Sequence, residues 1–247
     1  MIEVFQNSEE LNNFAADKFV EIAAESISER GRFTVALAGG STPKSLYRLL
    51  SGDKFKDKID WSKVFFFFGD ERNVSPDDAE SNFRMAHENL FAPLEINVNS
   101  IFPWLTQSET PEITAEIYQG EIKRFFDLGE TEFPIFDLIL LGMGADGHTA
   151  SLFPFTKALG ETEKIAVANP VEKLNTTRLT LTFPTINVAR NIIFLVAGED
   201  KAETLREVLE GKFQPERLPS QNVKPENGNL YWLLDENVAK LLRTYGN

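Results

Sequence analysis

Cysteine is absent from the 247 residues of this chain. Without thiols the chain can form neither a disulfide framework nor a thiolate metal site, which suits a reducing compartment. The chain also lacks any apolar run near the ~20 residues needed to span a bilayer. The segment from Met1 to Glu10 is acidic and has no apolar core, so it is not a signal peptide. We therefore expect a cytoplasmic protein with no membrane partner.

Positive charge is scarce, because 25 Lys and Arg residues stand against 38 Asp and Glu residues, for a formal net charge of −13. This balance argues against binding to nucleic acid, where Lys and Arg must meet phosphates. It does not exclude a small anionic substrate, since a few cations focused in one cleft attract a phosphate whatever the global charge.

Histidine is scarcer still, with only His87 and His148 in the chain. His87 and Glu88 do not extend to the zinc-binding His-Glu-x-x-His pattern, because residue 91 is Phe. We therefore interpret His87 as structural or exposed. No metal-ligand cluster and no nucleotide fingerprint is evident elsewhere, so we expect neither a metal nor a cofactor.

Strand-like and helix-like segments alternate along the chain. Strands are predicted at 33–37, 64–68, 136–141, 165–168, 178–183, 191–197 and 230–234. A first helix is predicted at 7–30, with Asn7 as its cap and Gly31 at its end, and a last one at 236–243. This alternation is typical of an α/β fold with a mainly parallel, Rossmann-like open sheet and helices on both faces. The length is sufficient for one domain, 1–247.

The stretch from Leu140 to Pro154 follows a predicted buried strand and contains three glycines within six residues. Glycine permits positive φ angles and lets a ligand approach the backbone. His148 stands at the exit of this turn, where an open α/β sheet presents side chains to a ligand crevice. A glycine turn with a surface histidine is the plainer interpretation. The position after a strand and the triplet Asp146-Gly147-His148 favour a functional one.

A second glycine turn, Gly39-Gly40, lies between a predicted strand and a helix that Thr42 caps and Pro43 opens. The free N–H groups and positive dipole end of such a helix bind phosphate, and the Ser41 and Thr42 hydroxyls can add donors. A plain strand-to-helix turn has the same composition, so this loop alone leaves both interpretations open. It is not a Walker loop, since Gly-Lys-[Ser/Thr] is missing.

Charged residues gather at other strand ends. Gly69-Asp70-Glu71-Arg72 follows the strand at 64–68, Arg178 begins a later strand, and Lys201 follows the strand at 191–197. Each cation alone is more typical of a surface. The loops after residues 37, 68, 141 and 197 share one edge of a parallel sheet, however, so we expect them to converge on one crevice. A guanidinium fork and an ammonium both suit a phosphate there.

The chemistry that these residues favour is general base catalysis on a water molecule. His148 has an unperturbed pKa of about 6.5, which suits proton transfer at neutral pH. The chain has no thiol and no Gly-x-Ser-x-Gly nucleophile elbow. Arg72 or loop N–H groups can stabilise an oxyanion. Asp146 or Asp70 can hold the imidazole tautomer, and the sequence does not choose between them.

Four motifs in order resemble those of the 6-phosphogluconolactonases, in the superfamily that includes the glucosamine-6-phosphate deaminases. They are Gly39-Gly40-Ser41-Thr42-Pro43; Gly69-Asp70-Glu71-Arg72 with Ser81-Asn82; Leu141 to Pro154; and Arg178 and Lys201 at their strand ends. The resemblance covers nearly the whole chain. It implies that family's three-layer sandwich fold.

For the site, the resemblance implies a catalytic role for His148, substrate contact by Arg72, and phosphate binding by Arg178, Lys201, Ser41 and Thr42, with Gly39, Gly40 and Gly144 in the substrate site. The implied reaction is hydrolysis of 6-phospho-D-glucono-1,5-lactone to 6-phosphogluconate in the oxidative pentose phosphate pathway. The implied partner is that lactone, in a monomer or homodimer.

The chain departs from the family at Ala145, where Pro is usual, and at Phe155, where Gly is common. Two alternative functions require features that this chain lacks. The deaminases carry Glu five residues after the histidine and Tyr after the Asp-Glu pair, whereas this chain has Phe153 and Arg72. A non-catalytic sugar-phosphate sensor needs a DNA-reading module, but one acidic helix precedes the first predicted strand.

Overall fold

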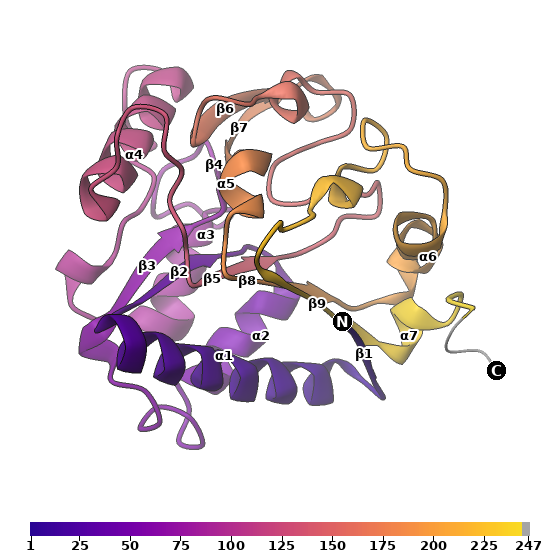
Figure 1. The fold of residues 1–247 in the computed structure, drawn as a ribbon, viewed down its shortest axis with the longest axis horizontal. Coiled ribbons are helices and arrows are strands. Elements are labelled where there is room, and N and C mark those ends of the chain that lie inside the picture. The colour runs from indigo at the N-terminus through magenta and orange to yellow at the C-terminus, as the bar shows by residue number, and fades with distance from the viewer. Residues whose placement is uncertain (244–247) are drawn as a thin grey trace.

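The computed structural model describes residues 1–243, and its centre is a sheet of six strands (Figure 1). The strand order is β1-β9-β8-β5-β2-β3, and all neighbours are parallel. The strands are β1 (Ile2–Phe5), β2 (Phe33–Leu37), β3 (Val64–Phe68), β5 (Leu138–Leu141), β8 (Asn191–Val196) and β9 (Asn229–Asp235). The predicted single domain, 1–247, ends in residues 244–247, which lie outside the described part.

A second, antiparallel sheet has the order β4-β7-β6. Its strands are β4 (Asp70–Arg72), β6 (Ala166–Val171) and β7 (Thr176–Leu181). The sequence predicted strands close to β6 and β7 but missed β1 and β4. Both missed strands are short and polar or only half-buried, so they carry little periodic signal.

Helices cover the six-stranded sheet, as predicted. Figure 1 shows α1 and α2 against one face, and α4 and α5 with the small sheet on the other side. The helices are α1 (Ser8–Arg30), α2 (Ser41–Leu50), α3 (Asn82–Ala86), α4 (Pro111–Phe126), α5 (Phe183–Asn187), α6 (Ala202–Glu210) and α7 (Glu236–Ala239). Short helical turns occupy Trp61–Lys63, His87–Phe91, Val98–Ser100, Lys157–Gly160, Glu172–Leu174, Glu199–Lys201 and Pro219–Asn222. The result is a three-layer α/β architecture.

The caps of α1 are those that the sequence predicted. The side chain of Asn7 accepts hydrogen bonds from two N–H groups of the first turn, and Gly31 ends the helix with a φ of 74°. The predicted start of α2 is wrong, because Gly40, and not Thr42, is the cap. Gly40 has a φ of 102°, which only glycine adopts freely, and this lets the chain enter the helix directly at Ser41.

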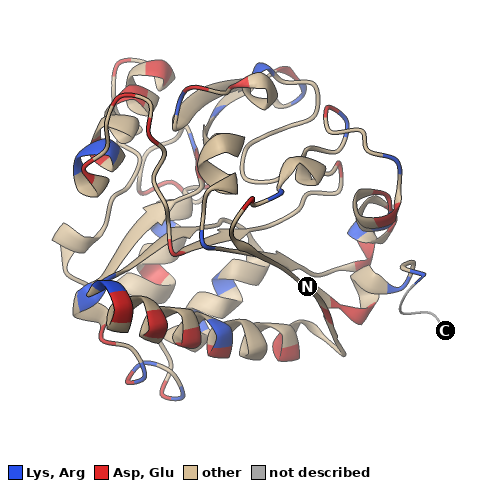
Figure 2. Ribbon diagram, viewed as in Figure 1, with Lys and Arg blue, Asp and Glu red and all other residues tan. Residues whose placement is uncertain are grey.

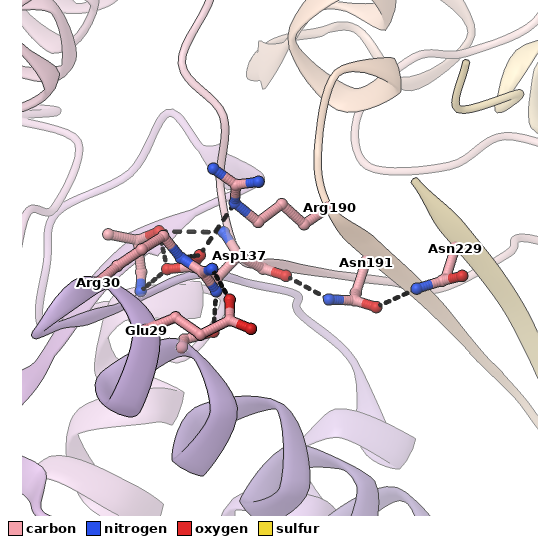
Figure 3. A network of polar contacts seen from close by, with 8 residues as sticks. Glu29, Arg30, Asp137, Arg190, Asn191 and Asn229 are labelled. Atoms are coloured by element: carbon pink, nitrogen blue, oxygen red, sulfur yellow. Dashed lines mark hydrogen bonds and ion pairs between the residues drawn. The ribbon is translucent and has the colours of Figure 1, made fainter. Parts of the chain in front are cut away.

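A buried carboxylate joins the elements at the amino ends of the strands (Figure 3). Asp137, just before β5, accepts hydrogen bonds from Arg30 Nε at 2.9 Å and from the backbone and hydroxyl of Thr34, both at 2.8 Å. Arg190 Nε lies 3.4 Å away. Asn191 donates to the Asp137 carbonyl. The network therefore ties α1, β2, β5 and β8 together at one edge of the sheet.

Charged residues lie along α1 and in the loops around the sheet, with acidic residues recurring along α1 (Figure 2). Within residues 1–243, no helix combines the length and apolar character needed to cross a membrane.

Candidate active site

A cleft of about 590 Å³ opens at the carboxyl edge of the large sheet. Its walls come from the loops after β2, β3 and β5, from β4 and β7, and from the turn that joins β6 to β7. Among the residues predicted for the site, the lining contains Gly39, Gly40, Asp70, Arg72, Gly144, Asp146, His148 and Arg178. Three of the four predicted loops therefore converge.

The fourth loop, after β8, does not line this cleft. The Gly198 N–H donates to the Asp235 carboxylate at 3.2 Å, which holds the loop at the end of β9. The ammonium of Lys201 donates to the carbonyl of Ala197 at 2.8 Å. The structure thus places Lys201 apart from the residues gathered around His148.

The His148 imidazole is held on three sides. Its ring stacks on Phe153 with centroids 4.1 Å apart and an angle of 23° between the planes. A Cβ atom at Gly144 would lie 2.1 Å from His148 Cε1, so only glycine lets the ring pack there. His148 Nδ1 lies 2.5 Å from Asp146 Oδ1. With Nδ1 engaged, Nε2 is the ring nitrogen left for a ligand.

Asp146, and not Asp70, is the carboxylate that contacts the imidazole. Asp146 Oδ1 also accepts the backbone N–H of His148 at 3.3 Å, and Oδ2 lies 3.2 Å from Lys173 Nζ. Partial burial raises the pKa of the Asp146 carboxyl, but hydrogen bonds and charge from His148, and then Lys173, outweigh burial and hold that pKa well below its usual value. The carboxylate is therefore ionised at neutral pH and fixes the proton on Nδ1.

Hydroxyl groups from distant parts of the chain hold the loop that carries His148. The Thr204 hydroxyl of α6 donates to the Ala145 carbonyl at 2.7 Å, and the Ser220 hydroxyl donates to the Gly147 carbonyl at 2.8 Å. Sequence reasoning missed both residues, because a hydroxyl that bonds a carbonyl more than fifty positions away leaves no local pattern.

The charged residues of β4 point alternately toward the cleft and away from it. Successive side chains of a strand point to opposite faces, so Asp70 and Arg72 line the cleft while Glu71 turns away from it. Glu71 instead accepts the backbone N–H groups of Asn82 and Phe83 at the start of α3, both at 2.8 Å. Burial raises the pKa of the Glu71 carboxyl despite these bonds. The prediction that Glu71 faces the crevice is therefore wrong.

Asp70 lines the cleft, and both of its carboxylate oxygens accept hydrogen bonds from the protein. Oδ2 accepts the hydroxyl of Ser151 at 2.7 Å, and Oδ1 accepts Asn82 Nδ2 at 3.3 Å. Ser151 lies in the glycine-rich stretch that the sequence singled out, but nothing local showed that its hydroxyl faces β4.

Two arginines stand opposite each other across the antiparallel pair of β4 and β7. Arg72 and Arg178 are register partners, and both line the cleft. Burial lowers the pKa of Arg178, and the charge of Arg72 lowers it further. Arg178 Nε is buried without a hydrogen-bond partner, whereas Arg72 Nη1 donates to the Glu80 carbonyl. Two guanidinium groups held this close favour an anion between them.

The start of α2 borders the same cleft through Gly39 and Gly40. No side chain caps this helix, so the first N–H groups remain available to an anion. A Cβ atom at Gly39 would lie 2.1 Å from Asn82 Oδ1, which requires glycine at that position. Ser41 and Thr42 follow as the first two residues of α2 and are not part of the cleft lining.

Phe155, at the position where the resembling family commonly has glycine, has a φ of 60°. This left-handed conformation is one that glycine adopts freely and a bulky residue does not. Phe155 lines a second cavity, which Phe153 also lines, and is not part of the lining of the cleft that contains His148. Among residues 1–243, no three His, Asp or Glu side chains gather in a way that could hold a metal ion.

Comparisons with known proteins agree on one family. A family model described as glucosamine-6-phosphate isomerases/6-phosphogluconolactonase matches residues 6–232. A 6-phosphogluconolactonase from Synechocystis sp. is 43% identical over 89% of this chain and 88% of its own length, and one from Nostoc sp. is 41% identical over 85% and 84%. The solved structure of a Trypanosoma brucei 6-phosphogluconolactonase superposes with a TM-score of 0.86 at 32% identity, covering 97% of each chain.

Proposed function

The chain belongs to the glucosamine-6-phosphate isomerase/6-phosphogluconolactonase family, and we propose that it hydrolyses 6-phospho-D-glucono-1,5-lactone to 6-phosphogluconate in the oxidative pentose phosphate pathway. It is an enzyme, a hydrolase acting on a lactone ester. The observation that carries the proposed mechanism is an imidazole fixed by a carboxylate, in one cleft with two arginines.

In the proposed mechanism, Nε2 of His148 accepts a proton from a water molecule as the water oxygen attacks C1 of the lactone. Asp146 holds the imidazole in the required tautomer and stabilises the imidazolium that forms. Arg72 and N–H groups of the loop stabilise the tetrahedral oxyanion. Its collapse breaks the bond between C1 and the ring oxygen, which takes the proton from His148. One water is consumed, and the new carboxyl group ionises.

The phosphate of the substrate is proposed to bind between the Gly39-Gly40 turn and Arg178. The turn offers the uncapped N–H groups of α2, and Arg178 offers a guanidinium whose Nε lacks a partner. A dianion there offsets the repulsion between Arg178 and Arg72, since each charge-assisted hydrogen bond is stronger than a neutral one. Asp70 has lone pairs left for a sugar hydroxyl.

Lys201, Ser41 and Thr42 belong to this proposal as secondary contacts. The Lys201 ammonium donates to the Ala197 carbonyl and does not line the cleft, so its side chain must move to contact the phosphate. The Ser41 and Thr42 side chains sit one and two residues beyond the turn, on α2. We therefore expect Arg178 to contribute more to phosphate binding than Lys201 does.

The deaminase alternative is disfavoured by the neighbour of the imidazole. A histidine–carboxylate relay requires an acid at residue 153, and the side chain there is the phenyl ring of Phe153, stacked on His148. The carboxylate that His148 does contact, Asp146, engages Nδ1 and leaves no second acid on the ring.

The test compares His148→Ala with His87→Ala, since these are the two histidines of the chain and His87 is exposed on a helical turn outside the cleft. Rates of 6-phospho-D-glucono-1,5-lactone opening are corrected for spontaneous hydrolysis. We expect a loss of about 10²–10⁴-fold for His148→Ala and none for His87→Ala. Full activity in His148→Ala would contradict the proposed mechanism. Ammonia release from glucosamine 6-phosphate by the wild type would favour the deaminase.

A cytoplasmic location and a monomeric or homodimeric state complete the proposal, and both stay predictions from the sequence.

A further inference from the structure

Asp146 has a second partner that no sequence motif indicated. Lys173 lies in the turn Glu172–Leu174 between β6 and β7, and its Nζ is 3.2 Å from Asp146 Oδ2. The other oxygen of the same carboxylate is 2.5 Å from His148 Nδ1. An ammonium, a carboxylate and an imidazole therefore stand in a row, contributed by two segments that are 27 residues apart.

Lys173 also lines two cavities. It lines the cleft that contains His148 and, together with Asp146 and Phe153, a second cavity of about 700 Å³. The lysine contacts Oδ2 of Asp146, whereas the imidazole contacts Oδ1. Its charge therefore acts on the imidazole through the shared carboxylate.

We propose that Lys173 is a positioning residue for the lactone reaction: it holds the Asp146 carboxylate through Oδ2 and offsets part of its charge, and this opposes the imidazolium form of His148. The inference deepens the proposed function and rests on it for the role of His148 as base. The lysine itself transfers no proton.

The direction of the effect follows from the charges around the ring. Asp146 favours the imidazolium, and Lys173 opposes it by adding a positive charge to the same group. The other charged side chains that line the cleft are Asp70, Arg72 and Arg178. Asp70 and the two arginines are carried by β4 and β7, and they are unchanged when Lys173 is replaced. A change at residue 173 therefore isolates one charge.

Solvent screening limits how strongly the charge of Lys173 acts on His148. The Lys173 side chain is 73% exposed, so its charge is screened and its ion pair contributes little to folding stability. Removal of one cation that is separated from an imidazole by a carboxylate, in largely aqueous surroundings, shifts the pKa of a histidine by roughly 0.3–0.6. Added salt reduces the shift, because exposed charges are screened within a Debye length of about 10 Å at 0.1 M.

The experiment records kcat/KM against pH for the wild type and for Lys173→Met, Lys173→Glu and Lys173→Arg. We expect the acid limb to move up by roughly 0.3–0.6 pH units in K173M and further in K173E, and to return to the wild-type position in K173R. At a pH below the limb, K173M then loses about two- to fourfold in rate. The shift shrinks in high salt.

The protonation of His148 is also measured directly, by an NMR titration without substrate. Imidazole resonances of His148 are followed by NMR against pH, with His87 as an internal reference because the chain has no third histidine. The His148 midpoint is expected to rise in K173M and K173E, while the His87 midpoint stays fixed. Lys157→Met is the matched control, since Lys157 also lines the second cavity but has no carboxylate partner among the described residues.

Unchanged His148 midpoints in both K173M and K173E would overturn the proposal. So would a loss of kcat/KM that is equal at every pH or appears only as a higher KM, because either would make Lys173 a structural or substrate-contact residue. A failure of the proposed function gives a different result from a failure of the Lys173 proposal. In that case the wild type does not open the lactone, while the NMR titration still reports whether Lys173 acts on His148.

Discussion

The imidazole of His148 owes its placement to three neighbours of different kinds. Asp146 bonds one ring nitrogen, Phe153 covers one face, and Gly144 leaves room that a side chain would fill. An imidazole held in this way is already oriented in the structure, and in the proposed role of base this lowers the cost of reaching the transition state.

Gly144→Ala tests the space beside the ring. The added Cβ would lie 2.1 Å from His148 Cε1, so the imidazole must move, and we expect a loss of kcat/KM of about 10²-fold. Gly142→Ala is the matched variant in the same loop, where a Cβ meets nothing within 4 Å, and it should lose far less. Initial rates and thermal unfolding are measured for both. Equal losses in the two variants would contradict the steric account.

Asp146→Asn tests the low pKa of this carboxyl through the stability of the fold. A group whose folded pKa is depressed contributes stability above its unfolded pKa, about 3.9, and this is lost as pH falls through the folded pKa. The wild type should exceed the variant by about 1–2 kcal/mol in unfolding free energy at pH 7. This difference should persist to about pH 4 and decline below it. Urea unfolding across the pH range measures it, and a difference that does not fall between about pH 4 and about pH 2 would refute the assignment.

At the scale of single elements, helix ends and strand faces decide which side chains reach the cleft. The three residues of β4 alternate, so Asp70 and Arg72 enter the cleft and Glu71 anchors α3. The uncapped start of α2 brings Gly40 to the same place. Each of these is a consequence of backbone geometry.

Replacing two glycines that have space for a side chain by alanine should change the stability of the fold in opposite directions. Gly31 ends α1 with a φ of 74°, and Gly120 lies inside α4; a Cβ at either meets nothing within 4 Å. Gly31→Ala should destabilise the fold by about 1 kcal/mol, because the left-handed conformation disfavours a side chain. Gly120→Ala should stabilise it by about 0.5–1 kcal/mol, because alanine favours the helix. Urea midpoints of the two variants should therefore move apart, and a shift of both in one direction would count against this reasoning.

At the scale of the whole molecule, the candidate active site and the buried Asp137 network lie at opposite edges of the large sheet. The cleft lies at the carboxyl ends of β2, β3 and β5, while the Asp137 network lies at the amino ends of β2, β5 and β8 (Figure 3). Ligand sites at the carboxyl edge are the rule for open parallel sheets. The amino edge is then free to carry a purely structural charge cluster.

Asp137→Asn tests that separation. The Asp137 side chain is 5% exposed and holds Arg30 and Thr34, so loss of its charge should cost about 2–4 kcal/mol in unfolding free energy. Lactone opening by the folded variant should stay near the wild-type rate. Asp53→Asn, which removes an ion pair whose carboxylate is 96% exposed, should leave stability unchanged. A large loss of activity in folded Asp137→Asn would show that the two edges are coupled.

The sequence by itself determined most of the central fold and singled out His148 as the candidate base. Apolar runs such as Val64–Phe68 and Leu138–Leu141 fill buried parallel strands, and Asn7 and Gly31 mark the ends of α1. These signals are local, since burial on both faces, capping and left-handed glycine each act within a few residues. The same local signals placed His148 after a strand and a glycine turn.

The tertiary structure alone decided which charged groups meet. It placed Asp146 on the imidazole and Asp70 on Ser151, turned Glu71 away, and left Lys201 on the Ala197 carbonyl. It also brought Lys173 to Asp146 from the β6–β7 turn. These contacts depend on the register of β4 against β7 and on the small antiparallel sheet beside the parallel one. The Asp70–Ser151 and Lys173–Asp146 contacts join residues 81 and 27 positions apart, and no pattern of neighbouring residues encodes them. Asp146 is only two residues from His148, but the sequence left Asp70 as an equal candidate for that contact.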